Sequence, residues 1–340
     1  MPLRLLVTLL STLLLGVMTM APARAIQPTN DNPFLITEIF GINWQWSADG
    51  SQFVFMDDGL YRVAVDVPEA KWYSYDFETE TLRSSTSWPL YPRDFPGTFL
   101  PVQNSNNIRS FAFGSPSSRF VVYATTQNRS FWQIAIGDLN QGSTQHVNAN
   151  IYDPFLGSPY FDVIWNSQES SFIISSSNDY SEPYFVHVTG INQPDSQIKS
   201  WFYISIPYGT ETYPVVKVLD ITADGTGVLA LTRQRLPPSS PQTFGAQYLV
   251  SASLDADGQL NIDWLIEGND IVAAAFLPTD ESKLLILNLQ GLVELDQNND
   301  NITVLEPRST FGVRVGAWFS PDAEWLAFQN EIGLYAYRLP

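Results

Sequence analysis

Residues Gly316–Phe328 read GAWFSPDAEWLAF. An apolar run that ends at Phe319 is followed by the turn-forming residues Ser320-Pro321-Asp322-Ala323, and a second apolar run begins at Trp325. Proline presets the φ angle of the first central position of a turn, and aspartate can hydrogen-bond the backbone just beyond itself. The stretch therefore predicts a β-hairpin, and its continuous apolar strands are typical of a sheet buried on both faces.

Five further segments align on the same turn, so the hairpin is a repeat. If the first turn residues are taken as equivalent, successive copies lie 43 to 68 residues apart. Self-similarity at such a period indicates β units that stack on one another or surround a common centre. The six turns then begin at Ser47, Ser115, Ser167, Thr222, Leu277 and Ser320.

The repeat also resembles that of a known family. A Ser-Pro-Asp turn between apolar strands, followed by a third strand such as Trp72–Glu80 or Gly333–Tyr335, is similar to the WD40-like (PD40) repeat of TolB-type propellers. The resemblance covers nearly all of the chain after residue 25 and implies an all-β, six-bladed β-propeller. It implies little about function, because this fold serves many roles.

The two ends of the predicted propeller are expected to meet. The last copy ends at Pro340, three residues after its third strand, so its sheet lacks a fourth strand. Residues 34–40, FLITEIF, have the pattern of a strand and precede the first copy. We expect this segment to supply the missing strand, since closure of the ring removes two unpaired strand edges.

The first 25 residues are interpreted as a secretory signal peptide. Arg4 precedes an apolar run of 16 residues from Leu5 to Met20, and Ala23-Arg24-Ala25 fits a signal-peptidase site. The run is shorter than the ~20 residues that a membrane-spanning helix needs, and no other segment is predicted to cross a membrane. We expect residues 1–25 to be removed, residues 26–33 to be a flexible leader, residues 34–340 to form the propeller, and the protein to be periplasmic or extracellular.

Composition limits the classes of partner. The chain has 17 basic and 35 acidic residues, a formal net charge of −18, and no cysteine, so neither a disulfide nor a thiol-based metal site can form. A strongly acidic surface repels nucleic acid and anionic lipid and therefore disfavours them as partners. A soluble monomer that binds a protein or a polar or glycan ligand is expected.

The long irregular segments, which include residues 148–161, 206–215 and 232–246, are predicted to gather on one face of the ring, and long loops often carry binding sites. Two sets of residues on this loop-rich face are candidates. The aromatic set, Trp88 and Tyr91, would form a platform for a ligand. The charged set, which comprises the other candidates, would surround the mouth of the central channel. The alternative is structural, since aromatic rings pack loops together and charges at a wet mouth pair with each other. The candidates are Trp88, Tyr91, Arg109, Asp162, Lys217, Asp270 and Arg314.

The sequence contains no recognisable catalytic, metal or cofactor motif, so none of these sites is predicted. The two histidines, His146 and His187, do not fit the spacing of a known catalytic arrangement. Two functions remain open: an exported, non-enzymatic module that binds through the loop-rich face, or a carbohydrate-active hydrolase or lyase with its site at the channel mouth. Carboxylates that converge in one pocket would favour the enzyme, and scattered or self-paired carboxylates would favour the module.

Overall fold

The computed structural model describes most of the chain after residue 32. The predicted signal peptide, residues 1–25, and nearly all of the predicted leader, residues 26–33, lie outside the described residues. These are 33–39, 41–47, 50–57, 72–85, 108–115, 119–128, 131–138, 140–141, 143–152, 161–176, 184–191, 198–208, 211–235, 244–255, 257–268, 270–312 and 316–340.

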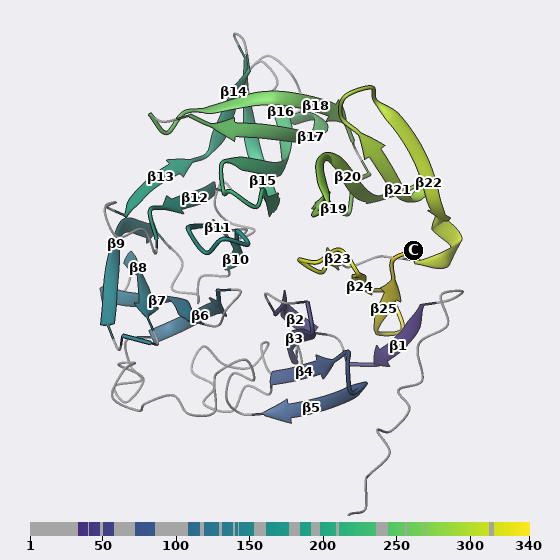
Figure 1. The fold of residues 1–340 in the computed structure, drawn as a ribbon, viewed down its shortest axis with the longest axis horizontal. Coiled ribbons are helices and arrows are strands. Elements are labelled where there is room, and N and C mark those ends of the chain that lie inside the picture. Colours follow the sequence, from purple (N-terminus) through teal and green to yellow (C-terminus); the bar gives the residue numbers. More distant parts are fainter. Residues whose placement is uncertain are drawn as a thin grey trace, which may run out of the picture.

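The described residues fold into antiparallel strands that form six sheets. Figure 1 shows the sheets around a common centre, with β2, β6, β10, β15, β19 and β23 nearest to it. This arrangement is a β-propeller, so the expectation of an all-β propeller is confirmed. The sheets are β2 (Gly41–Trp46), β3 (Gln52–Asp57), β4 (Trp72–Asp76) and β5 (Thr81–Ser85); β6 (Ile108–Gly114), β7 (Phe120–Asn128), β8 (Phe131–Asp138) and β9 (Ser143–Tyr152); β10 (Phe161–Trp165), β11 (Ser171–Ser176), β12 (Tyr184–Thr189) and β13 (Lys199–Tyr203); β14 (Ser205–Tyr208), β15 (Glu211–Ile221), β16 (Gly227–Arg235), β17 (Phe244–Leu254) and β18 (Leu260–Glu267); β19 (Ala273–Leu277), β20 (Asp280–Asn288), β21 (Gly291–Asp296) and β22 (Asn301–Pro307); and β1 (Phe34–Thr37), β25 (Leu334–Arg338), β24 (Trp325–Gln329) and β23 (Gly316–Phe319).

Helix is scarce in this part of the chain. The 3₁₀ turn η2 (Arg308–Thr310) is the one helical element among the described residues. None of those residues belongs to a helix with the length and apolar character needed to span a membrane.

The repeated turn is held by the side chain of its first residue. Ser320 Oγ accepts a hydrogen bond from the Trp325 N–H at 2.9 Å, and the Ser320 N–H donates to the Trp325 carbonyl oxygen at 2.8 Å. In the third copy the equivalent residue is Asn166, whose Oδ1 accepts from the Ser171 N–H, and not Ser167 as the alignment predicts. The amide oxygen of asparagine replaces the serine hydroxyl as the acceptor. The other residues that make this pair of bonds are Ser47, Ser115 and Thr222.

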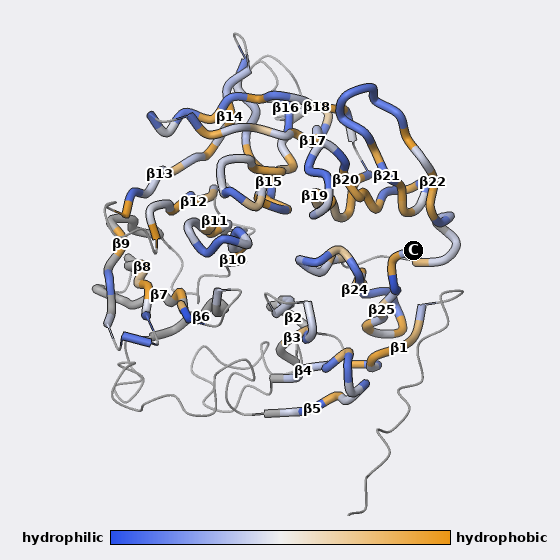
Figure 2. Tube along the Cα trace, in the orientation of Figure 1, coloured by the Kyte–Doolittle hydropathy of each residue, from blue (hydrophilic) through white to orange (hydrophobic). Residues whose placement is uncertain are grey.

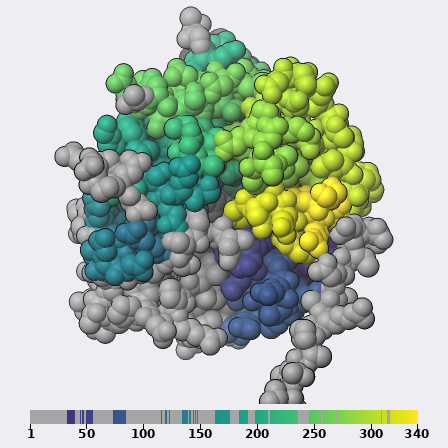
Figure 3. All heavy atoms as spheres, viewed as in Figure 1, coloured from purple at the N-terminus to yellow at the C-terminus, as the bar shows by residue number. Residues whose placement is uncertain are grey.

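The first and last strands share a sheet, which confirms the expected closure. β1 pairs antiparallel with β25, and Leu35 lies opposite Tyr335. A Cβ atom at Gly333 would lie 2.2 Å from the carbonyl oxygen of Thr37, so glycine is what allows β1 to approach this closely. In Figure 3 the yellow atoms of the last sheet lie against purple and blue atoms from the start of the chain.

The apolar core lies between neighbouring sheets. Phe172 and Ile174 of β11 pack with residues of β7 and β8, whereas Ile173 packs with residues of β15 and β16 on the other side. All three side chains are fully buried. Because both faces of an inner sheet are covered, its strands are continuously apolar. Figure 2 shows hydrophilic residues instead at the hairpin tip between β21 and β22, on the periphery.

Three segments predicted as loops contain strand residues in the structure. The segment 206–215 contains the β14–β15 hairpin, in which Ile206 pairs with Tyr213, and residues 148–152 continue β9. Pro207 and Pro214 interrupt the strand pattern of the hairpin, and proline within a run argues against a strand in sequence reasoning. The predicted loop 232–246 is also shorter, because β16 extends to Arg235 and β17 begins at Phe244.

His187 of β12 is fully buried between Ile173 and Trp201 of the adjacent strands. Neither ring nitrogen has a hydrogen-bond partner among the described residues. Burial lowers the pKa of His187 from 6.5 to about 4, and the nearby Gly225 backbone offsets a small part of this effect. The ring is therefore neutral in the folded protein at pH 7.

We expect acid to destabilise the fold through His187. The unfolded chain binds this proton below about pH 6.5 and the folded chain only below about pH 4, so stability present above pH 6.5 is lost as the pH falls toward 4. The full loss is about 3 kcal/mol of unfolding free energy. Urea unfolding of the wild type and of His187→Leu checks this: the unfolding free energy of the wild type should fall by about 3 kcal/mol relative to that of the variant between pH 7 and pH 4. The control Gln290→Leu, in the exposed turn after β20, should keep the wild-type profile, and a difference independent of pH would contradict the prediction.

Candidate functional site

The inner strands surround a cavity of about 380 Å³ at the centre of the ring. Ligand pockets are commonly between roughly 300 and 1,000 Å³, so this volume suits a small molecule or a side chain. The lining comes mainly from the second halves of the inner strands and from the turns that follow them. Its exposed members include Ser167 and Pro321 of those turns, so the mouth lies on the face that carries the repeated turns. The aromatic and charged lining residues are Trp44, Trp46, Trp165, Lys217, Asp220, Phe276, Glu281, Trp318, Phe319 and Asp322.

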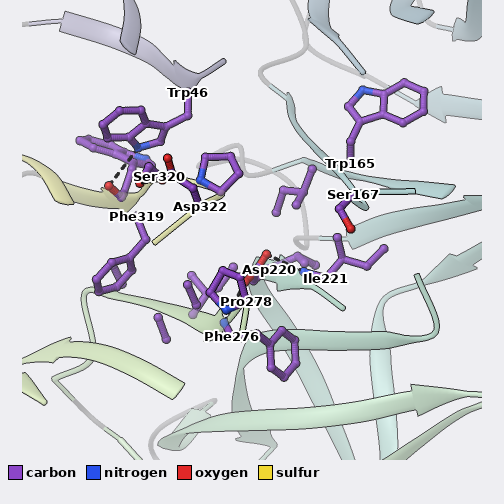
Figure 4. A pocket seen from close by; sticks show the side chains of 18 of the residues that line it. Trp46, Trp165, Ser167, Asp220, Ile221, Phe276, Pro278, Phe319, Ser320 and Asp322 are labelled. Carbon is purple, nitrogen blue, oxygen red and sulfur yellow. Dashed lines mark hydrogen bonds between the residues drawn. The ribbon is translucent and has the colours of Figure 1, made fainter. Parts of the chain in front are cut away.

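Tryptophan rings form much of the wall. Trp44 of β2 and Trp318 of β23 lie on different sheets, with ring centroids 4.3 Å apart. Trp46 Nε1 donates a hydrogen bond to the Trp318 carbonyl oxygen at 3.0 Å. Trp44 Nε1 is buried and has no partner in the described part of the chain. Buried donors are normally satisfied, so this N–H is an exception within the wall. Figure 4 shows Trp46 and Trp165 on different sides of the cavity.

Asp220 is directed into the cavity by a bulge in the inner strand β15. Val218 pairs with Ala230 and Asp220 with Leu229, so Leu219 is an extra residue in β15. A bulge re-aims the side chains that follow it. Without it, Asp220 would occupy the next register position. Figure 4 shows Asp220 beside Ile221 and Phe276 at the cavity wall.

The environment of Asp220 is enclosed, and the described residues around it supply no compensating positive charge. Its Oδ1 accepts from the Ile221 N–H and its Oδ2 from the Phe276 N–H, both at 2.8 Å. Burial, with a smaller repulsion from Glu281, outweighs these bonds and raises the pKa of Asp220 to about 7. Asp220 as a whole is half-buried, because its carboxylate borders the cavity. Protein atoms nevertheless surround the carboxylate closely. Close to neutral pH it therefore exchanges a proton.

Neighbouring turns are tied together around the mouth. Glu281 Oε1 accepts from the Ala223 N–H, and the Ala223 carbonyl oxygen accepts from Asn166 Nδ2 at 2.8 Å. The Asp322 carboxylate lies against Gly50, where a Cβ atom would be 2.5 Å from Oδ2. These contacts link turns of adjacent sheets, so the mouth is pre-formed.

The structure places few of the predicted binding residues. Lys217 lines the cavity, whereas Asp270 lies in an exposed turn before β19 and is not in the lining. Arg109 and Asp162 belong to β6 and β10, but their side chains lie outside the described part. These two stay predictions, as do the residues that fall outside the description altogether, Trp88, Tyr91 and Arg314.

Sequence reasoning missed the residues that matter most in the cavity. Trp46 and Trp165 each directly precede the first residue of their turn, and Trp318 is two residues before Ser320. This recurrence was a usable signal, but the rings were interpreted only as apolar strand residues. Asp220 gave no signal, because the bulge that aims it depends on pairing with β16.

Metal ligation has no structural support in the described residues. No group of three or more histidine, aspartate and glutamate residues among them is arranged to hold an ion.

Comparisons with known proteins give similarity in structure and not in sequence. No protein-family model matches the chain, and no curated protein matches it. The chain is similar to the tricorn protease, with 12% identity, 86% of this chain covered and a TM-score of 0.43, and it spans 29% of that chain's length. It is similar to the Pan2 WD40 domain of Neurospora crassa, with 10% identity, 89% and 90% of the two chains covered and a TM-score of 0.46. A protein described as TolB from Agrobacterium tumefaciens gives 13% identity, 67% and 66% coverage and a TM-score of 0.33. Such similarity concerns the fold and carries no inference about activity.

Proposed function

We propose that this chain is a non-enzymatic binding module that takes a small polar ligand, or a side chain of a protein partner, into its central cavity. The observation that supports this is the cavity itself: it is pre-formed, it has a suitable volume, and it combines tryptophan rings with a few polar groups. Pockets of this composition are typical binding sites. Hydrogen bonds between adjacent turns hold the mouth in shape before any ligand or protein binds.

The proposal includes the architecture and location of the complete protein. Each of the six sheets would be one blade of a TolB-type ring. Residues 1–25 would be removed as a signal peptide, which leaves the leader 26–33 ahead of the propeller. The mature protein would act as a monomer in the periplasm or outside the cell.

The loop-rich face remains a second candidate surface within this proposal. On the predicted strand directions it would lie at the other end of the central channel from the cavity mouth. Its predicted contacts for a protein or glycan are Trp88, Tyr91, Arg109, Asp162, Asp270 and Arg314, with Lys217 shared with the cavity.

We favour binding over carbohydrate hydrolysis because the cavity carboxylates have structural roles. Asp220 accepts backbone hydrogen bonds on both oxygens and thereby joins β15 to β19. Glu281 accepts from the Ala223 N–H across two sheets. Glycoside hydrolysis by the common two-carboxylate route needs one acid and one base or nucleophile free at the bond to be cleaved.

Closing the cavity mouth tests the proposal. Ser167→Trp places a large ring at an exposed mouth position, and Asn298→Trp places the same ring on an exposed peripheral turn as the control. We expect partners captured from the exported fraction of the source cells, and then purified, to bind the wild type and Asn298→Trp equally and Ser167→Trp at least tenfold more weakly. Equal binding to all three proteins would contradict a role for the cavity.

A further inference from the structure

We infer that the group which enters the cavity is a cation, an ammonium or guanidinium group, held by the Asp220 carboxylate between tryptophan rings. This inference rests on the proposed binding function and specifies the chemistry of the occupant. Three features of the described residues carry it: the charge of the lining, the state of Asp220 and the aromatic wall.

The charges that face Asp220 inside the cavity are mostly negative. Glu281 and Asp322 also line it, and Lys217 is the one basic residue among the described lining residues. An anionic ligand would therefore meet repulsion at close range. The net charge of −18 for the whole chain attracts cations from a distance as well.

Among the described residues, Asp220 has no positively charged partner. Its hydrogen bonds come from the uncharged N–H groups of Ile221 and Phe276, and the charged group that affects it most is Glu281, which repels it. Enclosing a carboxylate without a counter-charge is costly, and a cationic ligand removes that cost. The site is therefore complementary to positive charge before any ligand arrives.

The wall suits the same kind of ligand. The faces of indole rings attract ammonium and guanidinium groups within about 6 Å of the ring centroid. Trp44 and Trp318 stand together at one side, with Trp46 bonded to the Trp318 backbone. A neutral sugar would also stack on these rings, but it would leave the charge of Asp220 uncompensated. The combination of rings and carboxylate therefore favours a cation.

Binding should then depend on pH. A cation stabilises the ionised form of Asp220, whose pKa burial raises to about 7, so binding takes the proton away from the carboxylate. Protonation competes with the ligand below this pKa and ceases to matter above it. We expect about tenfold weaker binding at pH 6 than at pH 8. The other charged side chains that face the same space are Glu281, Asp322 and Lys217.

The experiment titrates the purified protein with acetyl-arginine amide, acetyl-lysine amide, 1,5-diaminopentane and the neutral acetyl-norleucine amide, with tryptophan fluorescence as the readout. We expect saturable binding of the cationic probes and at least tenfold weaker binding of the norleucine amide. Preference for the amino-acid amides would indicate a side chain of a partner, and preference for the diamine would indicate a free amine; both outcomes support the cation.

Two variants separate the role of Asp220 from general charge. Asp220→Asn should weaken the cationic probes at least tenfold and abolish the difference between pH 6 and pH 8. Asp257→Asn, which removes an exposed carboxylate outside the cavity lining, should bind like the wild type. If Asp220→Asn does not fold, the pH series on the wild type and on Asp257→Asn decides the question.

The inference is overturned if no cationic probe binds, if the norleucine amide binds as tightly, or if binding is the same at both pH values. These failures differ from failure of the proposed function. If a partner is excluded by Ser167→Trp but binds Asp220→Asn as tightly as the wild type, the cation inference is wrong and the cavity remains the binding site. A partner indifferent to Ser167→Trp overturns the cavity as the binding site.

Discussion

Deletion of residues 33–39 is expected to lower the melting temperature by about 10 °C or more, or to prevent folding. The deletion removes β1, whose Phe34 and Ile36 pack with Ile39 against the cluster around Trp325 and Leu334. Each buried side chain of this kind contributes roughly 1.5–3 kcal/mol, so the total is about 5 kcal/mol. The deletion also leaves the edge of β25 unpaired, which favours aggregation.

The matched control is a chain that lacks residues 26–32 and keeps β1. Its melting temperature should equal that of the protein that keeps residues 26–32, because β1 begins at Phe34. Thermal unfolding followed by circular dichroism measures both proteins. A melting temperature that survives the removal of residues 33–39 would show that β1 does not hold the ring together.

Phe328→Ala is expected to cost about 3–5 kcal/mol of unfolding free energy. Phe328 is 1% exposed and packs on Tyr335 and Phe311, with ring centroids 5.5 and 5.4 Å away. The sequence predicts the same cost for Trp318→Ala if that ring is core. The structure instead places Trp318 half-buried in the cavity wall, so we expect about half the cost of Phe328→Ala.

Urea unfolding of the two variants beside the wild type gives the comparison. The midpoints should shift with little change in slope, because neither substitution alters the size of the fold. Equal costs, or a larger cost for Trp318→Ala, would mean that Trp318 is a core residue and not part of a binding wall.

The propeller was readable from the sequence because its signals are local. A turn such as Ser320-Pro321-Asp322-Ala323 places its capping residue, its strand ends and its apolar runs within a dozen residues. The third strands also follow from local patterns, and β4, Trp72–Asp76, lies within the predicted third-strand segment Trp72–Glu80. Closure by β1 was predictable because the last copy of the repeat has only three strands and residues 34–40 have the pattern of one further strand.

The cavity was not readable, because its residues come from strands far apart in the chain. Trp44 and Trp318 meet only when the first and last sheets become neighbours. The orientation of Asp220 depends on a bulge that is visible only in the pairing of β15 with β16. Asn166 was misaligned by one residue because its role is defined by a hydrogen bond and not by residue type. Sequence reasoning therefore placed the expected binding residues on the loop-rich face, at the opposite end of the channel.

A ring in which the start and the end of the chain share one sheet underlies both the cavity and its proposed ligand, and a cross-link measures this directly. Leu35 and Tyr335 are partners in the β1–β25 pairing, and facing residues of antiparallel strands have Cα separations of roughly 4.5–5.5 Å, within the range of a disulfide. The chain has no cysteine of its own, so the double variant Leu35→Cys, Tyr335→Cys has no competing thiol. On oxidation it should form an intramolecular disulfide in nearly every molecule and melt at a higher temperature than its reduced form, because the long closed loop contributes up to about 5 kcal/mol. The control Leu35→Cys, Ile302→Cys, which places the second thiol on an exposed position of β22, should keep both thiols free. Free thiols in the Leu35–Tyr335 pair after oxidation, or equal cross-linking in the control, would contradict the closed ring.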